Sequence, residues 1–214
     1  NSSLNYFLSK ILLLSGLLSA IIGAFLAMVQ KDFKRILAYS SISQMGYILL
    51  AAATFTPLGI IAAVFHIINH ATFKTVLFLN SACVEKQTGT LNIEELKGLE
   101  HKMPVTSWTS IIAMMATAGI PPLSGFWSKL LIIVALWQNG NIFYAVVALI
   151  ASVITLAYFV NLQKKVFFGK LPERFNTLKE AKTPLLVPVV VISAIIIFAG
   201  LFFNKVYGYL SKII

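Results

Sequence analysis

The stretch PVTSWTSIIAMMATAGIPPLSGFWSKLLIIVALW, residues 104–137, is predominantly apolar but too long for one straight membrane helix. A bilayer core of about 30 Å is crossed by about 20 apolar residues. Prolines remove backbone donors and clash with the preceding helical turn, while glycines adopt backbone angles that other residues avoid. We therefore predict a single crossing built from two half-helices, with the break at Gly119, Pro121, Pro122 and Gly125.

The rest of the chain carries similar apolar runs separated by short polar stretches. Of its 214 residues, 58% are hydrophobic and only 11% are charged, about half the charged share of ordinary soluble domains. This composition predicts an all-α polytopic membrane protein with six transmembrane segments, the fourth of which is the broken helix. The other five predicted segments are 10–29, 36–53, 58–84, 142–163 and 185–203.

Basic residues concentrate in alternate loops. Loops 31–35, 85–102 and 164–182 hold twelve of the 17 lysines and arginines, whereas the two connections on the other side hold none. By the positive-inside rule, these loops face the cytoplasm and both termini lie outside. The net charge of +10 then reflects membrane topology rather than nucleic-acid binding, and we expect a multi-pass protein of the cell membrane or an inner membrane.

Four ionisable side chains fall inside predicted transmembrane segments, namely His66, His70, Lys74 and Lys129. Such groups cost about 2.5–3.5 kcal/mol at the middle of a membrane helix, so they are rare and often functional. Positions 66, 70 and 74 lie on one helical face. As an alternative to a functional role, these three groups could do no more than join helices through hydrogen bonds. Similarly, the Lys129 side chain could extend to the membrane surface. A proton relay explains three ionisable groups in register better.

We expect no metal and no redox cofactor in this chain. Two histidines four residues apart could share an ion, but they lack further ligands and Lys74 would repel a cation. There is no cysteine cluster, Rossmann-type glycine fingerprint or haem-ligand pattern. Elsewhere, Ser40, Ser43, Gln44 and Tyr47 could carry ordered water, but helix contacts are the commoner use of such residues and are what we expect. We also expect local pairing of Asp32 with Lys31 or Arg35, and a short surface helix in which Ile93, Leu96 and Leu99 face the membrane or a neighbouring protein.

Three motifs resemble a known family. They are QKDFKRILAYSSISQMGYILLA at 30–51, FHIINHATFKTVLFLNSACV at 65–84 and GIPPLSGFWSKLLI at 119–132. In sequence, order and spacing they resemble the antiporter-like subunits of respiratory complex I, membrane-bound hydrogenases and Mrp-type cation/proton antiporters. The resemblance covers most of the chain from residue 30 to residue 132.

The resemblance implies a particular architecture and particular roles. Residues 1–169 would form one five-helix antiporter repeat, and residues 170–214 an amphiphilic loop and a closing transmembrane helix. Lys129 matches the lysine of the family's broken helix, and His66, His70 and Lys74 match the relay positions of the preceding helix. Lys34, in DFKR, matches the lysine at the edge of the proton path.

The resemblance also implies a function. The chain would translocate protons, or exchange Na⁺ for H⁺, as a subunit of a redox-driven complex, supplying one half-channel but no redox site. The family's first repeat is absent from these residues, so the chain is either a split subunit or a fragment. We expect other membrane subunits, a companion chain carrying the N-terminal repeat, and membrane lipid as partners. The alternatives are a non-conducting scaffold subunit or a free-standing transporter, which would need both repeats.

Overall fold

The computed structural model describes residues 2–213, and within that range all regular structure is helical. Two short 3₁₀ helices, Leu99–His101 and Glu173–Phe175, lie in the longer loops. The α-helices are α1 (Ser2–Val29), α2 (Phe33–Ala52), α3 (Pro57–Thr88), α4 (Pro104–Ala118), α5 (Ser124–Gln138), α6 (Ile142–Val166), α7 (Thr183–Leu201) and α8 (Phe203–Ile213).

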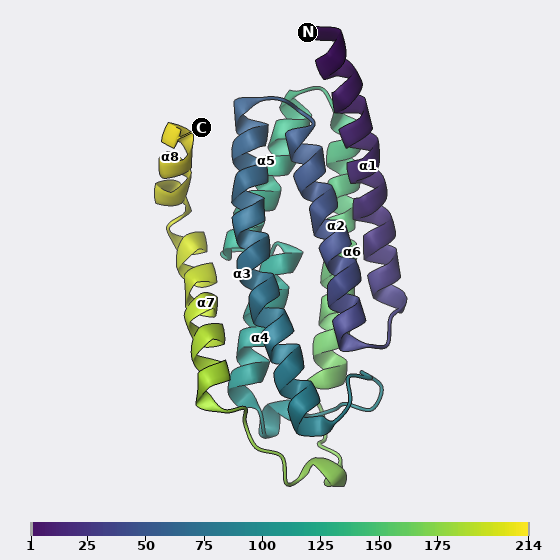
Figure 1. Cartoon of the computed structure of the whole chain (residues 1–214), viewed down its shortest axis with the longest axis vertical. Coiled ribbons are helices and arrows are strands. Elements are labelled where there is room, and N and C mark those ends of the chain that lie inside the picture. Colours follow the sequence, from purple (N-terminus) through teal and green to yellow (C-terminus); the bar gives the residue numbers. More distant parts are fainter. Residues whose placement is uncertain (1, 214) are drawn as a thin grey trace.

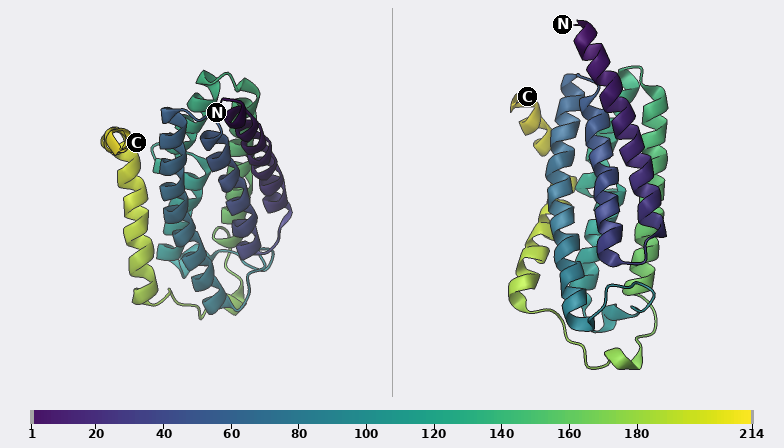
Figure 2. Two further views of the ribbon diagram at one scale, coloured as in Figure 1. Left: turned by 45° about the horizontal axis from the view of Figure 1, so that its top comes forward. Right: turned by 45° about the vertical axis from the view of Figure 1, so that its right-hand side comes forward.

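Helices α1 to α6 form an elongated bundle, with α7 along one side of it (Figure 1). The α1–α2, α3–α4 and α6–α7 connections lie at one end of the bundle, and the α2–α3 and α5–α6 connections lie at the other (Figures 1 and 2). Helix α7 packs against α3, α4 and α5. Helix α8, which the sequence pattern did not reveal, continues beyond α7 towards the end opposite the basic loops.

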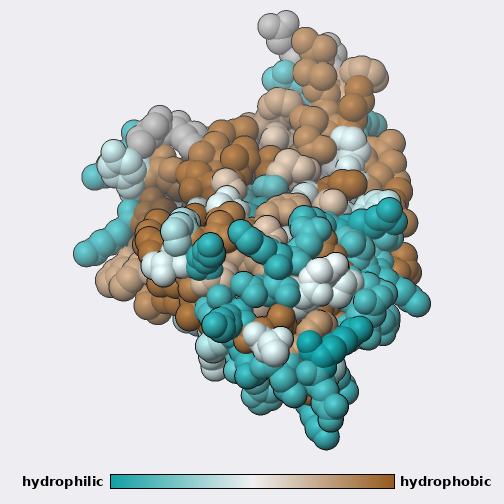
Figure 3. Space-filling view, turned by 60° about the horizontal axis from the view of Figure 1, so that its bottom comes forward, coloured by the Kyte–Doolittle hydropathy of each residue, from teal (hydrophilic) through white to brown (hydrophobic). Residues whose placement is uncertain are grey.

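Four helices in the described part are long and apolar enough to cross a membrane: α1, α3, α6 and α7. Helix α5 is apolar but shorter, and α2 carries Lys34 and Arg35 in its first turn and buried polar residues further along. Hydrophilic residues gather at the end that bears the long loops, while hydrophobic residues cover the adjoining sides (Figure 3). This surface matches a bundle whose sides face lipid.

Helices α4 and α5 are separated by residues 119–123. Gly119 ends α4 with φ +89°, a left-handed conformation that favours glycine, and its N–H donates to the carbonyls of Met115 and Ala116. The Pro121–Pro122 peptide bond is cis. A Cβ atom on Gly125 would collide with the carbonyl oxygen of Ala116, so only glycine lets α5 start this close to α4. All four residues of the predicted break thus lie at or next to the interruption.

Two apolar clusters fill the bundle, one towards each end. The cluster nearer the long loops includes Phe33, Phe73 and Phe167. The other includes Leu50, Ile132 and Ala148. On four of the helices the residues between the two clusters are largely polar and buried: Ser40, Ser43 and Gln44 on α2, His66 and Asn69 on α3, Ser124, Ser128 and Lys129 on α5, and Thr155 on α6. We call this set the polar mid-layer.

The loop end differs from two expectations. Residues 91–98 form one turn, at 93–95, and irregular backbone rather than a surface helix. Backbone hydrogen bonds from the N–H of Phe33 to Leu91 and from the N–H of Ile93 to Lys31 hold this segment against the α1–α2 connection. The three expected apolar residues, Ile93, Leu96 and Leu99, are fully buried beneath the loops. They cover the end of the core rather than facing lipid or a neighbouring protein.

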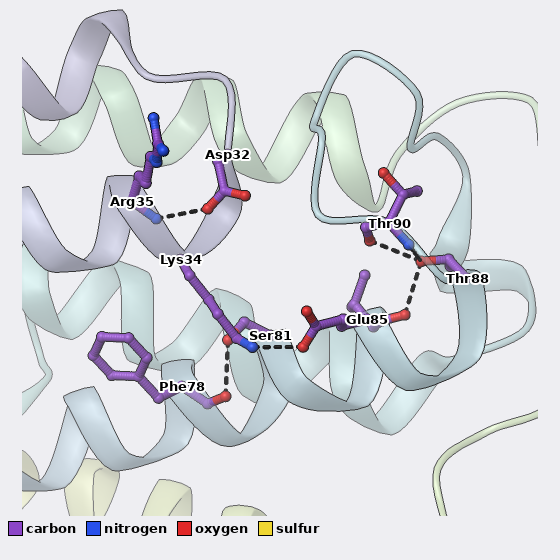
Figure 4. A network of polar contacts seen from close by, with 9 residues as sticks. Asp32, Lys34, Arg35, Phe78, Ser81, Glu85, Thr88 and Thr90 are labelled. Carbon is purple, nitrogen blue, oxygen red and sulfur yellow. Dashed lines mark hydrogen bonds and ion pairs between the residues drawn. The ribbon is translucent and has the colours of Figure 1, made fainter.

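Asp32 does not pair with the side chain of Lys31 or Arg35. Its carboxylate accepts a hydrogen bond of 2.8 Å from the backbone N–H of Arg35 and so caps the N-terminus of α2 (Figure 4). A free N–H at a helix start is satisfied best by a short acidic or hydroxyl side chain at this position. The local-pairing prediction is therefore wrong, because the helix end offers Asp32 a fixed donor.

Candidate functional site

Lys74 extends from α3 to α2 within the bundle. Its side chain is buried, and its Nζ donates a hydrogen bond of 2.8 Å to the carbonyl oxygen of Leu37 and another to the hydroxyl of Ser40. These two acceptors lie three and six residues after Lys34, which places Lys74 about 5–9 Å further along α2 than Lys34. Lys74 therefore lies between the loop end of the bundle and the polar mid-layer.

Lys129 lies inside the bundle and not at its surface. It is only 3% exposed, and its side chain points back along α5 towards the break. The Nζ lies 3.4 Å from the carbonyl oxygen of Ala118, the last residue of α4. The carbonyl end of a helix carries a partial negative charge, which favours a nearby cation. The interrupted backbone thus supplies the polar surroundings that a buried ammonium requires.

His66 connects α3 to α5 one residue before Lys129. Its Nδ1 lies 2.9 Å from the hydroxyl of Ser128, and the imidazole is fully buried. The other ring nitrogen, Nε2, has no hydrogen-bond partner among the described residues. A buried, singly bonded imidazole can accept or donate a proton at its second nitrogen.

His70 is half-buried, and its ring packs edge-on against Phe73 at a centroid distance of 5.6 Å. Its Nε2 also lacks a partner among the described residues. Within residues 2–213, the hydrogen bonds of His66, Lys74 and Lys129 go to other groups, and none joins the four ionisable residues directly to one another. Proton movement along these four residues would therefore need intermediate groups, such as bound water.

Lys34 lies at the loop end, apart from the buried lysines. Its Nζ forms an ion pair of 2.5 Å with Glu85 near the end of α3, and both side chains are partly exposed, at 40% and 47% (Figure 4). Exposed ion pairs contribute little to stability. The geometry fits the expected place of Lys34 at the edge of a path, and its role there remains a prediction.

The sequence did not predict that Ser40 and Tyr47 contact the buried lysines. Both belong to the group for which the sequence favours helix contacts, and Ser43 makes such a contact through a hydrogen bond of 2.8 Å to the carbonyl of Ala20. Ser40 instead contacts Lys74, and the Tyr47 ring centroid lies 4.6 Å from the Nζ of Lys129. Positions 40 and 47 are seven residues apart and share a helical face, which is the signal that could have singled them out.

Glu180 was not singled out either, because nothing near it in the sequence reveals its partner. From the α6–α7 loop, its carboxylate accepts hydrogen bonds from the backbone N–H groups of Val105 and Thr106 and from the Thr106 hydroxyl. Met103, the N-cap residue of α4, makes no side-chain cap. Glu180 therefore caps the N-terminus of α4, the helix whose last carbonyl, that of Ala118, lies 3.4 Å from the Nζ of Lys129.

The described residues contain no group of three or more His, Cys, Asp or Glu side chains placed to hold a metal ion. The one cysteine, Cys83, is buried and unpaired. The prediction that the chain carries no metal or cofactor remains a prediction.

Comparison with known proteins identifies the family. Residues 2–155 match the family described as NADH:quinone oxidoreductase/Mrp antiporter, transmembrane. One Na⁺/H⁺ antiporter subunit of Alkalihalophilus pseudofirmus is 36% identical over 201 residues, which cover 93% of this chain and 40% of that protein. The chain spans less than half the length of the curated relatives it matches.

Solved structures share the fold. A chain of the membrane-bound sulfane sulfur reductase, an archaeal respiratory membrane complex, superposes with a TM-score of 0.86 at 35% identity, over 90% of this chain and 32% of that one. A chain of the Mrp complex from Dietzia sp. DQ12-45-1b superposes with a TM-score of 0.89 at 24% identity, over 95% of this chain and 46% of that one. The chain is therefore a multi-pass membrane protein that belongs to the NADH:quinone oxidoreductase/Mrp antiporter transmembrane family.

Proposed function

We propose that this chain moves protons, alone or in exchange for Na⁺, as an antiporter-like subunit of a redox-driven membrane complex. The observation that carries the proposal is the buried ammonium of Lys129 at the carbonyl end of α4. A lysine buried at membrane depth is costly and is found mainly on ion pathways. The membership of a family that includes antiporter subunits supports the same function.

In this proposal, α4 and α5 together make one of six crossings. Each has 15 residues and is about 22 Å long, which is too short to cross a core of about 30 Å alone. Non-helical backbone at this depth is tolerated where it is buried in protein or lines a wet cavity. The basic loops face the cytoplasm, because the three loops that carry most lysines and arginines lie at one end of the bundle.

The chain's own residues would move the proton in steps. Lys74 exchanges a proton near Ser40, His66 and His70 pass it along α3 with bound water, and Lys129 holds it beside the break. A positive charge arriving at His66 disfavours the ammonium of Lys129 through like-charge repulsion. Lys129 then releases its proton. Redox energy comes from other subunits, and this chain holds no cofactor of its own.

We propose further that residues 1–169 form one antiporter repeat, closed by residues 170–214. The other repeat would come from the rest of the same subunit or from a companion chain, since the matched relatives are more than twice as long as the matching region. One similar structure is part of a respiratory membrane complex, which supports partnership with other membrane subunits. Lipid would cover the exposed apolar sides of α1 and α6.

The test is ion transport by the assembled complex in membrane vesicles. The Lys129→Ala variant should lose proton or sodium transport while the complex still assembles. Lys129→Arg should lose it as well, because a guanidinium keeps its charge but does not release its proton. Lys170→Ala, which removes an exposed loop lysine, is the matched control and should transport normally. Normal transport by an assembled Lys129→Ala complex would refute the proposal and favour a non-conducting scaffold.

A further inference from the structure

Tyr47 is one of the largest fully buried side chains in the protein, and its hydroxyl is fixed at α6. The hydroxyl donates a hydrogen bond of 2.7 Å to the carbonyl of Ala148 and lies 2.9 Å from the hydroxyl of Ser152. These two bonds leave the aromatic ring little freedom to rotate or shift. The tyrosine therefore joins α2 to α6 at the edge of the polar mid-layer, with its ring held in place.

The Tyr47 ring lies against Lys129 and His66, two residues of the proposed proton path that belong to the polar mid-layer. The Nζ of Lys129 is 4.6 Å from the ring centroid, within the range of a cation–π contact. The His66 ring centroid is 5.9 Å away, with the two rings tilted by 40°. Tyr47 therefore contacts the charge on Lys129 and the imidazole beside it at the same time.

Few other groups can stabilise the ammonium of Lys129. The two ion pairs in the described residues, Lys34–Glu85 and Lys165–Glu94, both lie at the loop end. Helices α4 and α7 contain no titratable side chain. Helix α3 carries the bases His66, His70 and Lys74 along its middle, and Cys83, Glu85 and Lys86 near its loop end, where Glu85 is paired with Lys34. From α6 come Tyr144 and Tyr158, with Lys164 and Lys165 in its last turn, and from α2 come Tyr47 itself, Tyr39 and the terminal Lys34 and Arg35.

Lys129 is thus left with a long hydrogen bond to Ala118 and the face of the Tyr47 ring. We propose that Tyr47 is a positioning residue for ion transport: its ring face holds the protonated form of Lys129 at the break and thereby sets the pH at which Lys129 releases its proton. This inference rests on the proposed function of Lys129. In this proposal an uncharged aromatic ring, rather than a carboxylate, stabilises the protonated form of Lys129.

The strength of the contact gives the size of the effect. A cation–π contact is worth about 0.5 kcal/mol at exposed sites and about 2 kcal/mol when desolvated, which corresponds to about a 2-fold to 30-fold change in the ratio of protonated to neutral lysine. Weakening the ring should therefore move the alkaline limb of the transport profile towards lower pH, by up to about 1.5 units. Loss of packing alone would lower the rate without moving the profile.

The experiment uses a graded series at position 47 in the complete complex. Tyr47→Phe keeps the ring and loses the hydroxyl, and fluorinated phenylalanines carrying one, two and three fluorines then withdraw electron density from the ring with little change in shape. The transport rate of each variant is measured in vesicles as a function of pH. Tyr47→Leu removes the ring, and Phe33→Leu, at another fully buried aromatic on α2, controls for lost volume.

The proposal expects the alkaline limb to move to lower pH stepwise with each fluorine and furthest in Tyr47→Leu, while Phe33→Leu leaves its position unchanged. Coincident profiles across the fluorinated series overturn it. Equal loss of transport in Tyr47→Phe and Tyr47→Leu also overturns it and reduces Tyr47 to a tie between α2 and α6. If Lys129→Ala transports normally, the proposed function itself fails, and the two failures are therefore distinguishable.

Discussion

Replacing Glu180 tests whether a distant loop stabilises α4, the helix whose last residue, Ala118, contacts Lys129. The Glu180 carboxylate takes the place of an N-cap on α4: it lies 2.7 Å from the N–H of Val105, 3.3 Å from that of Thr106 and 2.7 Å from the Thr106 hydroxyl. Removing a helix cap costs about 0.5–2 kcal/mol, and losing a negative charge from a helix N-terminus adds about 0.3–1 kcal/mol. Glu180→Ala should therefore destabilise the first turn of α4 by about 2 kcal/mol.

Glu180→Gln separates the two contributions. The amide oxygen can still accept one hydrogen bond, but the charge is lost, so we expect a cost of about 1 kcal/mol. Hydrogen exchange at the amides of Val105 and Thr106 in the purified complex measures the local opening directly. Because about 1.4 kcal/mol corresponds to a tenfold change in an equilibrium constant, exchange should accelerate about 30-fold in Glu180→Ala and about 5-fold in Glu180→Gln.

The matched control is Glu173→Gln in the same loop, since the Glu173 side chain is exposed and its backbone carbonyl accepts a hydrogen bond from Asn176 that the substitution retains. This variant should leave exchange at α4 unchanged. If both Glu180 variants exchange at the normal rate, α4 does not depend on the loop, and the reasoning from the observed hydrogen bonds is refuted.

Two further predictions concern the break and the loop end. Gly119→Val should lower the free energy of unfolding of the solubilised complex by at least about 1–2 kcal/mol, because a β-branched residue fits poorly at φ +89°. The control is Gly208→Ala, where an added Cβ would meet no atom within 4 Å. Equal melting temperatures for the two variants would contradict the prediction. The hydrogen bond from Lys165 holds the pKa of the Glu94 carboxyl below its usual value. This contact therefore stabilises the loop fully at pH values above the usual carboxyl pKa. The stabilisation is lost as the pH falls through the lowered pKa of Glu94. Proteolysis of the 91–98 loop should therefore accelerate in acid, and Glu94→Gln should show the fast rate at neutral pH; equal rates for Glu94→Gln and the unaltered protein at neutral pH would contradict this.

The sequence by itself determined what depends on local order and composition. A long apolar stretch with two prolines between two glycines can continue as a helix only up to the interruption, so the end of α4 and the start of α5 were readable from residues 119–125. The 3.6-residue period placed His66, His70 and Lys74 on one face without any knowledge of the neighbouring helices. Charge counts placed the three basic loops at one end of the bundle, as Figure 1 shows.

Loop conformations and helix ends were predicted less well, because they depend on competing partners. Asp32 had basic neighbours available, but the fixed N–H of Arg35 satisfied its carboxylate instead. The apolar residues of the 91–98 loop pointed towards a surface helix, but the segment pairs through its backbone with the α1–α2 connection and forms one turn and irregular backbone. Helix α8 begins directly after the interruption at Phe202, where the sequence pattern indicated only the end of the closing helix.

Only the tertiary structure decided which partners the buried polar groups have. Lys74 contacts Ser40 across 34 positions of sequence, Lys129 contacts the Tyr47 ring across 82, and Glu180 reaches the start of α4 across more than 70. A periodic pattern fixes the face on which a side chain lies, but the opposing side chain depends on how the helices rotate and slide against each other as they pack. For that reason the sequence could mark Lys129 as costly, whereas the structure alone showed which groups lie against its ammonium.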